Sequence, residues 1–146
     1  MPIVSNLEFE YLAELHLMVL IQGLTPASDS EWNAYLDELR QAFRSGGLAR
    51  SLVVTGGAYP TRSQQNRMTS IVESRAPRVA VVSSSTPLRF VVSILALLNR
   101  NVSCFEPTQR GAAFLHLLLS PSEQALAEST IERLRRMMTL ADTTAA

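Results

Sequence analysis

Apolar residues recur along the chain with two different periods, and these separate the expected strands from the expected helices. Short apolar runs predict β-strands at residues 8–12, 15–22, 52–55, 79–83 and 102–105. Longer segments with an apolar residue at every third or fourth position predict helices at residues 29–45, 62–75, 87–98, 108–119 and 122–140. The predicted order is β-β-α-β-α-β-α-β-α-α. Because helices separate the later strands, we expect an α/β fold with right-handed crossovers and a mostly parallel sheet, opened by an N-terminal hairpin.

Several predicted helices begin with sequences that satisfy free backbone N–H groups. Ser28 and Thr61 are each followed three residues later by Glu or Gln, which is the pattern of a capping box. Thr86 precedes Pro87, which predicts Thr86 as the N-cap and Pro87 at the first helical position. No linker or internal repeat interrupts the chain. We therefore expect one domain over residues 1–140 and a frayed tail over residues 141–146.

Length and composition are typical of a globular domain with its own apolar core. Of the 146 residues, 47% are hydrophobic, so no metal or disulfide is needed to hold the fold. Thirteen acidic residues balance thirteen basic ones, which argues against a nucleic-acid-binding protein. The apolar runs fall short of the ~20 residues of a membrane span. A single cysteine, Cys104, and a first segment unlike a signal peptide predict a cytoplasmic protein.

The charges are unevenly distributed, although they sum to zero. Residues 1–47 hold five more acids than bases, whereas residues 48–110 hold six more bases than acids, and every basic residue is arginine. Two interpretations remain open. The charges are spread over solvated faces, or the acidic flank of one molecule pairs with the basic flank of another.

Three predicted strands lead into loops that offer serine, threonine, glycine and arginine. If the strands are parallel, these loops gather at one edge of the sheet, where α/β proteins bind ligands. Two of the loops deliver helix N-termini, which favour an anion or a phosphorylated side chain. The candidate residues for a site that holds an anion, or that is itself phosphorylated as a switch, are Gly56, Gly57, Thr61, Arg62, Ser63, Ser85, Thr86 and Arg89. The alternative is that these residues only form turns and cap helices.

The predicted helix at residues 87–98 is apolar around its whole circumference. A helix on one face of a small sheet buries only part of its surface, so its other side needs a further partner. Three partners are considered: the C-terminal helix of the same chain, a second copy of the protein, or an apolar ligand or membrane surface. The candidate residues of a protein interface are Arg67, Phe90, Val91, Ile94 and Leu97.

The remaining chemically active side chains give no spacing typical of a cofactor or metal site. His16 and His116 have no second ligand nearby in sequence, and Cys104 lies in an expected buried strand. No phosphate-binding or dinucleotide-binding glycine motif is present. An enzyme that uses Cys104 or a loop serine as nucleophile is therefore the weakest hypothesis, and we expect no metal, no cofactor and no catalysis.

The order of elements and the loops resemble the STAS-like superfamily of anti-sigma factor antagonists, especially its small bacterial members. The matching residues are those of segments 52–65, 78–85 and 101–107, together with Trp32. In that superfamily a partner kinase phosphorylates a serine at the start of the helix after the third strand, where this chain has Thr61 and Ser63. The resemblance implies a non-catalytic module that binds proteins through this loop and helix. We therefore expect a regulatory protein that is switched at residues 56–67 and, because of its apolar helix, forms homo-oligomers. The alternative is a module that binds a small molecule or lipid.

Overall fold

The computed structural model describes residues 5–45, 47–72, 75–95 and 101–144, and it contains a five-stranded mixed sheet. The strands lie side by side in chain order: β1 (Leu7–Leu12), β2 (Leu17–Gln22), β3 (Arg50–Thr55), β4 (Arg78–Val82) and β5 (Val102–Phe105). β1 pairs with β2 in antiparallel orientation, and the other three pairs are parallel. The prediction of a mostly parallel sheet opened by a hairpin is therefore confirmed.

The turn between β1 and β2 forms without a glycine. A 3-10 turn at Ala13–Leu15 leads into His16, whose φ of 51° lies in the left-handed region. The His16 N–H donates to the Ala13 carbonyl oxygen at 3.2 Å. A histidine thus takes the conformation that Gly or Asn more often supplies.

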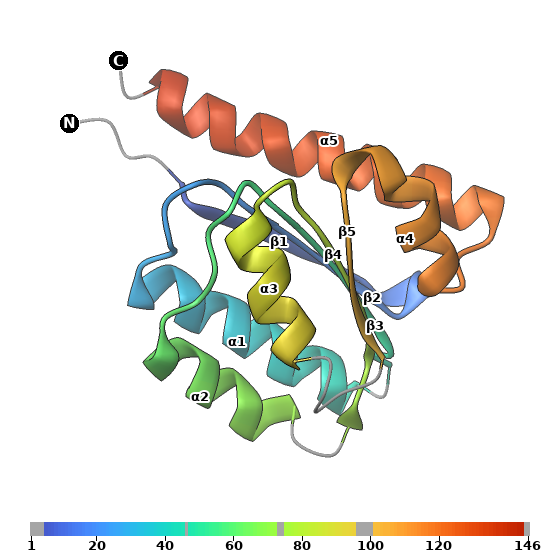
Figure 1. The fold of residues 1–146 in the computed structure, drawn as a ribbon, viewed down its shortest axis with the longest axis horizontal. Coiled ribbons are helices and arrows are strands. Elements are labelled where there is room, and N and C mark those ends of the chain that lie inside the picture. Colours follow the sequence, from blue (N-terminus) through green and yellow to red (C-terminus); the bar gives the residue numbers. More distant parts are fainter. Residues whose placement is uncertain (1–4, 46, 73–74, 96–100, 145–146) are drawn as a thin grey trace.

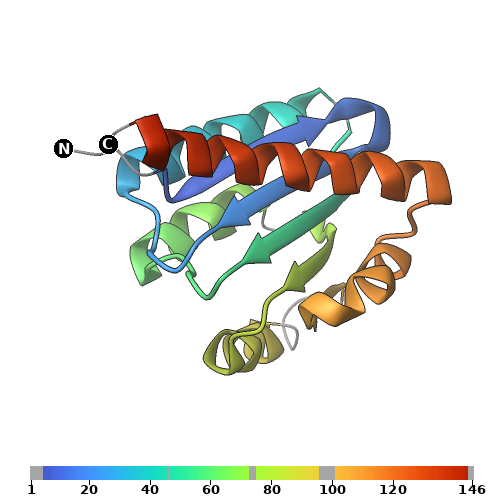
Figure 2. The ribbon, with the colours of Figure 1, turned by 90° about the horizontal axis from the view of Figure 1, so that it is seen from above.

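The helices form one layer on each face of the sheet (Figures 1 and 2). Three crossover helices cover one face: α1 (Asp29–Arg44), α2 (Arg62–Val72) and α3 (Thr86–Leu95). The parallel strands β2 to β5 lie across the sheet in the order in which they occur along the chain. Right-handed crossovers between them therefore place all three helices on the same face. The short α4 (Arg110–His116), which follows a 3-10 turn at Pro107–Gln109, and the long α5 (Pro121–Thr144) cover the other face.

Alternation along the central strand β2 fills both cores. Leu17, Val19 and Ile21 belong to the cluster under α4 and α5, whereas Met18 and Leu20 face α1 and α2. All five side chains are at least 97% buried. A fully buried strand of this kind has no polar face, as its sequence indicates.

For the later helices, the structure excludes one of the partners considered for the helix after β4 and extends the last helix. The C-terminal helix does not cover the helix after β4, because α5 and α3 lie on opposite faces of the sheet (Figure 1). The expected frayed tail is helical as far as Thr144. The last residues of the predicted helix 87–98 lie outside the described part of the chain.

Two arginines at the amino ends of the parallel strands hold the end of α4. The Arg50 guanidinium donates to the carbonyl oxygens of Leu15, Leu117 and Leu118, and Arg78 donates to that of His116 at 3.1 Å. These carbonyls include the free acceptors at the helix C-terminus. Part of the basic excess in residues 48–110 therefore has a structural role.

Candidate functional site

The carboxyl ends of the parallel strands meet at one edge of the sheet, as predicted. The Gly56 N–H donates to the Gln22 carbonyl oxygen, which joins the ends of β2 and β3, and the Ser83 N–H donates to that of Phe105, which joins the ends of β4 and β5. A Cβ built on Gly57 would lie 3.6 Å from the Cβ of Ser85, so the two middle loops are in contact. Gly57 has a φ of 141°, which favours glycine.

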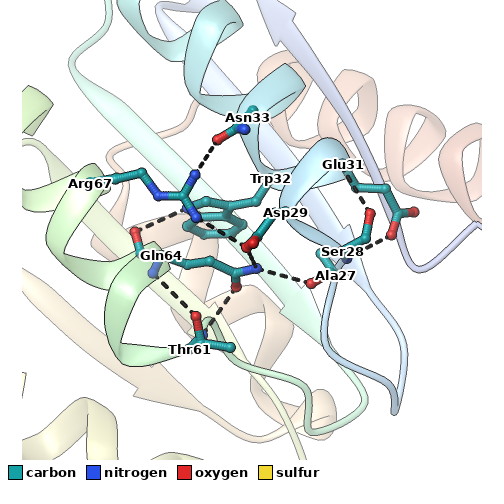
Figure 3. Close-up of polar contacts among 9 residues, drawn as sticks. All are labelled: Ala27, Ser28, Asp29, Glu31, Trp32, Asn33, Thr61, Gln64 and Arg67. Carbon is teal, nitrogen blue, oxygen red and sulfur yellow. Dashed lines mark hydrogen bonds and ion pairs between the residues drawn. The ribbon is translucent and has the colours of Figure 1, made fainter.

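The start of α2 is closed by the capping box that its sequence predicts. The Gln64 N–H donates to Thr61 Oγ1 at 3.2 Å, and the Thr61 N–H donates to Gln64 Oε1 at 3.0 Å (Figure 3). Unlike an ordinary capping residue on a surface, Gln64 is only 1% exposed. Its side chain therefore has a second role inside the protein.

That second role is to bind the start of α1. Gln64 Nε2 donates to the Ala27 carbonyl oxygen at 3.1 Å and to Asp29 Oδ1 at 3.0 Å, and Trp32 Nε1 donates to the Gln64 carbonyl oxygen at 3.1 Å (Figure 3). Arg67 completes the contact. We call these five residues, Ala27, Asp29, Trp32, Gln64 and Arg67, the α1–α2 clamp. The sequence predicts the helix starts but not their mutual attachment.

The side chain of Arg67, a candidate interface residue, is bonded to α1 of the same chain. Its guanidinium donates to Asn33 Oδ1 at 2.6 Å and to Asp29 Oδ1 at 3.0 Å. The Gln64 amide first, and then Arg67, hold the pKa of the Asp29 carboxyl below its ordinary value. Asp29 therefore stays ionised at neutral pH and keeps both contacts.

The first turn of α2 presents its remaining side chains to solvent. Thr61, Arg62 and Ser63 are exposed. The Thr61 hydroxyl is used as the cap. Within the described residues, Ser63 Oγ makes no hydrogen bond and Arg62 forms no ion pair. Thr61 and Ser63 thus lie close together, but the Thr61 hydroxyl already caps the helix whereas the Ser63 hydroxyl does not.

The start of α3 differs from its prediction. Ser85 Oγ, not the Thr86 hydroxyl, accepts from the N–H three residues later, that of Leu88, at 3.3 Å. Thr86 is already helical and Pro87 takes the second position. Arg89, predicted to hold an anion, pairs with Glu106 at 2.7 Å. The physical reason is that Glu106, at the end of β5, reaches the same edge of the sheet from a distant part of the sequence.

A pocket of about 430 Å³ opens at the same edge, toward α5. Its polar wall includes Thr55 and Ser84, which belong to the predicted strand-end loops, and two arginines that the sequence analysis missed, Arg110 and Arg135. Arg110 pairs with Glu128 at 2.8 Å. These arginines belong to α4 and α5, which are separated from the loops by many residues, so no local pattern indicates that they lie here.

Other predicted interface residues cannot be placed. The side chains of Phe90, Val91 and Ile94, and the whole of Leu97, lie outside the described part of the structure. The described apolar residues of α3, Leu88 and Val92, pack against Val81 of β4. No described helix is long and apolar enough to cross a membrane.

Cys104 and His116 pack against neighbouring side chains, as expected, but β5 with Cys104 is only partly buried and not the buried strand that its sequence predicts. Burial is the main cause that raises the pKa of the Cys104 thiol, which disfavours the nucleophilic thiolate. His116 packs its ring against Phe105, with centroids 5.8 Å apart, and its Nε2 lies 2.8 Å from the Asn101 carbonyl oxygen. Among the residues that can be described, no group of three His, Cys, Asp or Glu side chains is placed to hold a metal.

The geometry thus combines two helix starts joined by hydrogen bonds with an exposed turn at the carboxyl edge of the parallel strands. Compared with protein-family models, with curated proteins and with solved structures, the chain matches none.

Proposed function

We propose that this protein is a non-catalytic regulatory module of the STAS type that binds a protein partner in the cytoplasm through the start of α2. The observation on which this depends is the exposed turn Thr61–Ser63 beside the α1–α2 clamp, of which Ala27, Trp32 and Gln64 are buried. A rigid support of this kind presents one surface without reordering on binding, which reduces the entropic cost of association. The element order, with one antiparallel hairpin before parallel crossovers, also supports the proposal.

Ser63 is the residue that we assign as the switch. It occupies the second position of α2, where a phosphate lies close to free backbone N–H groups and to the positive end of the helix dipole. Arg62 is adjacent in sequence, and Arg67 follows four residues later. Phosphorylation of Thr61 would instead remove the cap from Gln64 N. A phosphate at Ser63 changes the charge of the surface and leaves the clamp intact.

The proposed switch predicts a change in partner binding when Ser63 is replaced by glutamate. We expect at least one protein that co-purifies with the wild-type chain from its native cells to fall by about tenfold, which corresponds to ~1.4 kcal/mol of binding free energy. The measurement is quantitative mass spectrometry of the captured proteins. Ser63→Ala, which adds no charge, should capture the same proteins as the wild type.

Ser30→Glu is the matched control. Ser30 is exposed and occupies the second position of α1 behind a capping box, but it lies between Asp29 and Glu31 instead of beside arginine. We expect this variant to keep the wild-type partners. Identical sets of proteins captured by wild type and Ser63→Glu would contradict the assignment of the switch.

Self-association is the second part of the proposal. The sequence of α3 and the following residues is apolar on all sides, and α5 lies on the opposite face of the sheet. We therefore propose a second copy of the chain as the partner of Phe90, Val91, Ile94 and Leu97. Light scattering after size-exclusion chromatography is expected to give at least a dimer. A monomeric mass at every concentration would contradict this part.

A further inference from the structure

A second pocket, of about 360 Å³, lies between the sheet and the layer formed by α1, α2 and α3. It lies on the face of the sheet that α1, α2 and α3 cover, whereas the pocket beside Arg110 lies toward α5, and Gln22 and Thr55 border both pockets. Its walls are mainly aliphatic and include Val53, Met68, Val79, Val81, Leu88 and Val92. Tyr59, which is 44% exposed, also borders it.

One wall of this pocket holds a buried amide with an unused donor. Gln22, the last residue of β2, is 5% exposed, and its Nε2 has no hydrogen-bond partner among the described residues. Side chains alternate along a strand, so Gln22 points to the same face as Leu20, which also lines the pocket. A buried donor without an acceptor reduces stability, and such groups usually have a functional explanation.

The other buried polar side chains in the walls have partners within the protein. The Thr55 hydroxyl, beside Gln22 on β3, donates to the Ala58 carbonyl oxygen at 2.8 Å and accepts from the Gly57 N–H. Gln65 Nε2 donates to the Pro60 carbonyl oxygen at 2.8 Å, and Thr69 Oγ1 donates to the Gln65 carbonyl oxygen. Ser51 is hydrogen-bonded to Tyr35. Among the buried side chains of the walls, Gln22 Nε2 is therefore the donor that remains for a ligand.

The walls contain no Asp, Glu, Lys, Arg or His among the described residues. Burial raises the pKa of Tyr35 to about 12, which agrees with an environment that disfavours charge. A charged group bound here would lose its hydration without gaining an opposite charge. The volume is near the lower end of the ~300–1,000 Å³ typical of ligand pockets, which suits a molecule of one or two rings.

We infer that this pocket binds an uncharged, mainly hydrocarbon molecule that carries a carbonyl group as acceptor for Gln22 Nε2. The hydrocarbon body lies between α2, α3 and the sheet, and the carbonyl lies at the end of β2. This site does not depend on the proposed switch at Ser63. Both the amide and the aliphatic walls contribute to recognition, so the inference can be tested with an uncharged probe that has a carbonyl, an uncharged probe without one, and an anion.

The test uses three fluorescent naphthalene probes. 6-Propionyl-2-dimethylaminonaphthalene is uncharged and has one ketone, N-phenyl-1-naphthylamine is uncharged without a carbonyl, and 1-anilinonaphthalene-8-sulfonate is an anion. Titration of the wild-type protein should give saturable binding of both uncharged probes. The anion should bind at least about tenfold more weakly than N-phenyl-1-naphthylamine, because its sulfonate has no partner in the pocket.

Gln22→Leu removes the donor and keeps nearly the same volume. We expect it to weaken binding of the ketone probe about tenfold and to leave N-phenyl-1-naphthylamine unchanged or tighter. The melting temperature should not fall, because the variant removes an unpaired buried amide. Gln124→Leu, on α5 at the opposite face, is the matched control and should change neither affinity.

A second variant locates the probes. Thr69→Phe places a ring at the pocket from the exposed side of α2 and should weaken both uncharged probes. The inference is overturned if the wild type binds neither uncharged probe, if Gln22→Leu leaves the preference for the ketone unchanged, or if Thr69→Phe leaves both affinities unchanged. Equal affinity for the anion and N-phenyl-1-naphthylamine would overturn the assignment of an uncharged ligand.

Discussion

Gln64→Leu is expected to lower the free energy of unfolding by about 2–4 kcal/mol, a large effect for one polar substitution. The side chain forms three hydrogen bonds: one accepted from Thr61 N, and two donated to the Ala27 carbonyl oxygen and Asp29 Oδ1. Leucine has a similar volume, so little of the loss arises from a cavity. The cost comes from the buried Ala27 carbonyl, which keeps no equivalent donor, and from the weakened start of α2.

Urea denaturation at neutral pH, followed by circular dichroism, measures this loss. Gln65→Leu is the matched control, because Gln65 is the next residue of the same helix and is partly exposed with a single side-chain bond to the Pro60 carbonyl oxygen. We expect it to cost no more than about 1 kcal/mol. If the two variants lose equal stability, the α1–α2 clamp does not hold the two helices together.

The Gln64→Leu difference should also depend on pH. The folded-state pKa of Asp29 is lowered mainly by Gln64, so this contribution to stability is present above the unfolded-state pKa and is lost as pH falls through the folded-state value. The variant raises the pKa of Asp29 toward its ordinary value. We therefore expect the stability difference between the two proteins to narrow on the acid side of ~pH 4. If the difference in free energy of unfolding between the two proteins does not change with pH, the Gln64–Asp29 contact does not contribute to it.

Arg50→Met is expected to lower the free energy of unfolding by about 2–3 kcal/mol. The guanidinium joins the end of α4 to the first strands by donating to the carbonyl oxygens of Leu15, Leu117 and Leu118, and it lies 3.8 Å from a carboxylate oxygen of Glu123. Its side chain is 15% exposed, so solvent replaces these donors only in part. Methionine retains the apolar stem and therefore isolates the loss of the donors.

Arg40→Met is the control for the loss of a positive charge. Arg40 pairs with Asp37 three residues earlier on the exposed side of α1, and such surface pairs contribute about 0–1 kcal/mol. Urea denaturation of both variants should give a clearly larger loss for Arg50→Met. Equal losses would indicate that the carbonyl contacts of Arg50 contribute no more than a surface ion pair.

Local patterns determined most of the secondary structure. The period of the apolar residues identified the strands and helices, and the sequences after Ser28 and Thr61 formed the capping boxes that they predict. Local chemistry was insufficient at the start of α3, where Ser85 and Thr86 both offer a hydroxyl and the geometry of the turn selected Ser85. The position of the candidate switch could also be predicted from local sequence, because a helix that starts just after a strand is recognised from neighbouring residues.

The sequence by itself also determined a mostly parallel sheet with right-handed crossovers. The order of the strands across the sheet came from the structure, and with that order the right-handed connections place the three crossover helices on one face. Only the tertiary structure decided the face of α5, since no strand follows it and no handedness rule applies. Contacts between distant residues, such as Gln64 with Asp29 and Arg50 with Leu117, were decided in the same way. The unused donor of Gln22 depends on which partners reach the end of β2, and packing of the whole chain sets those partners.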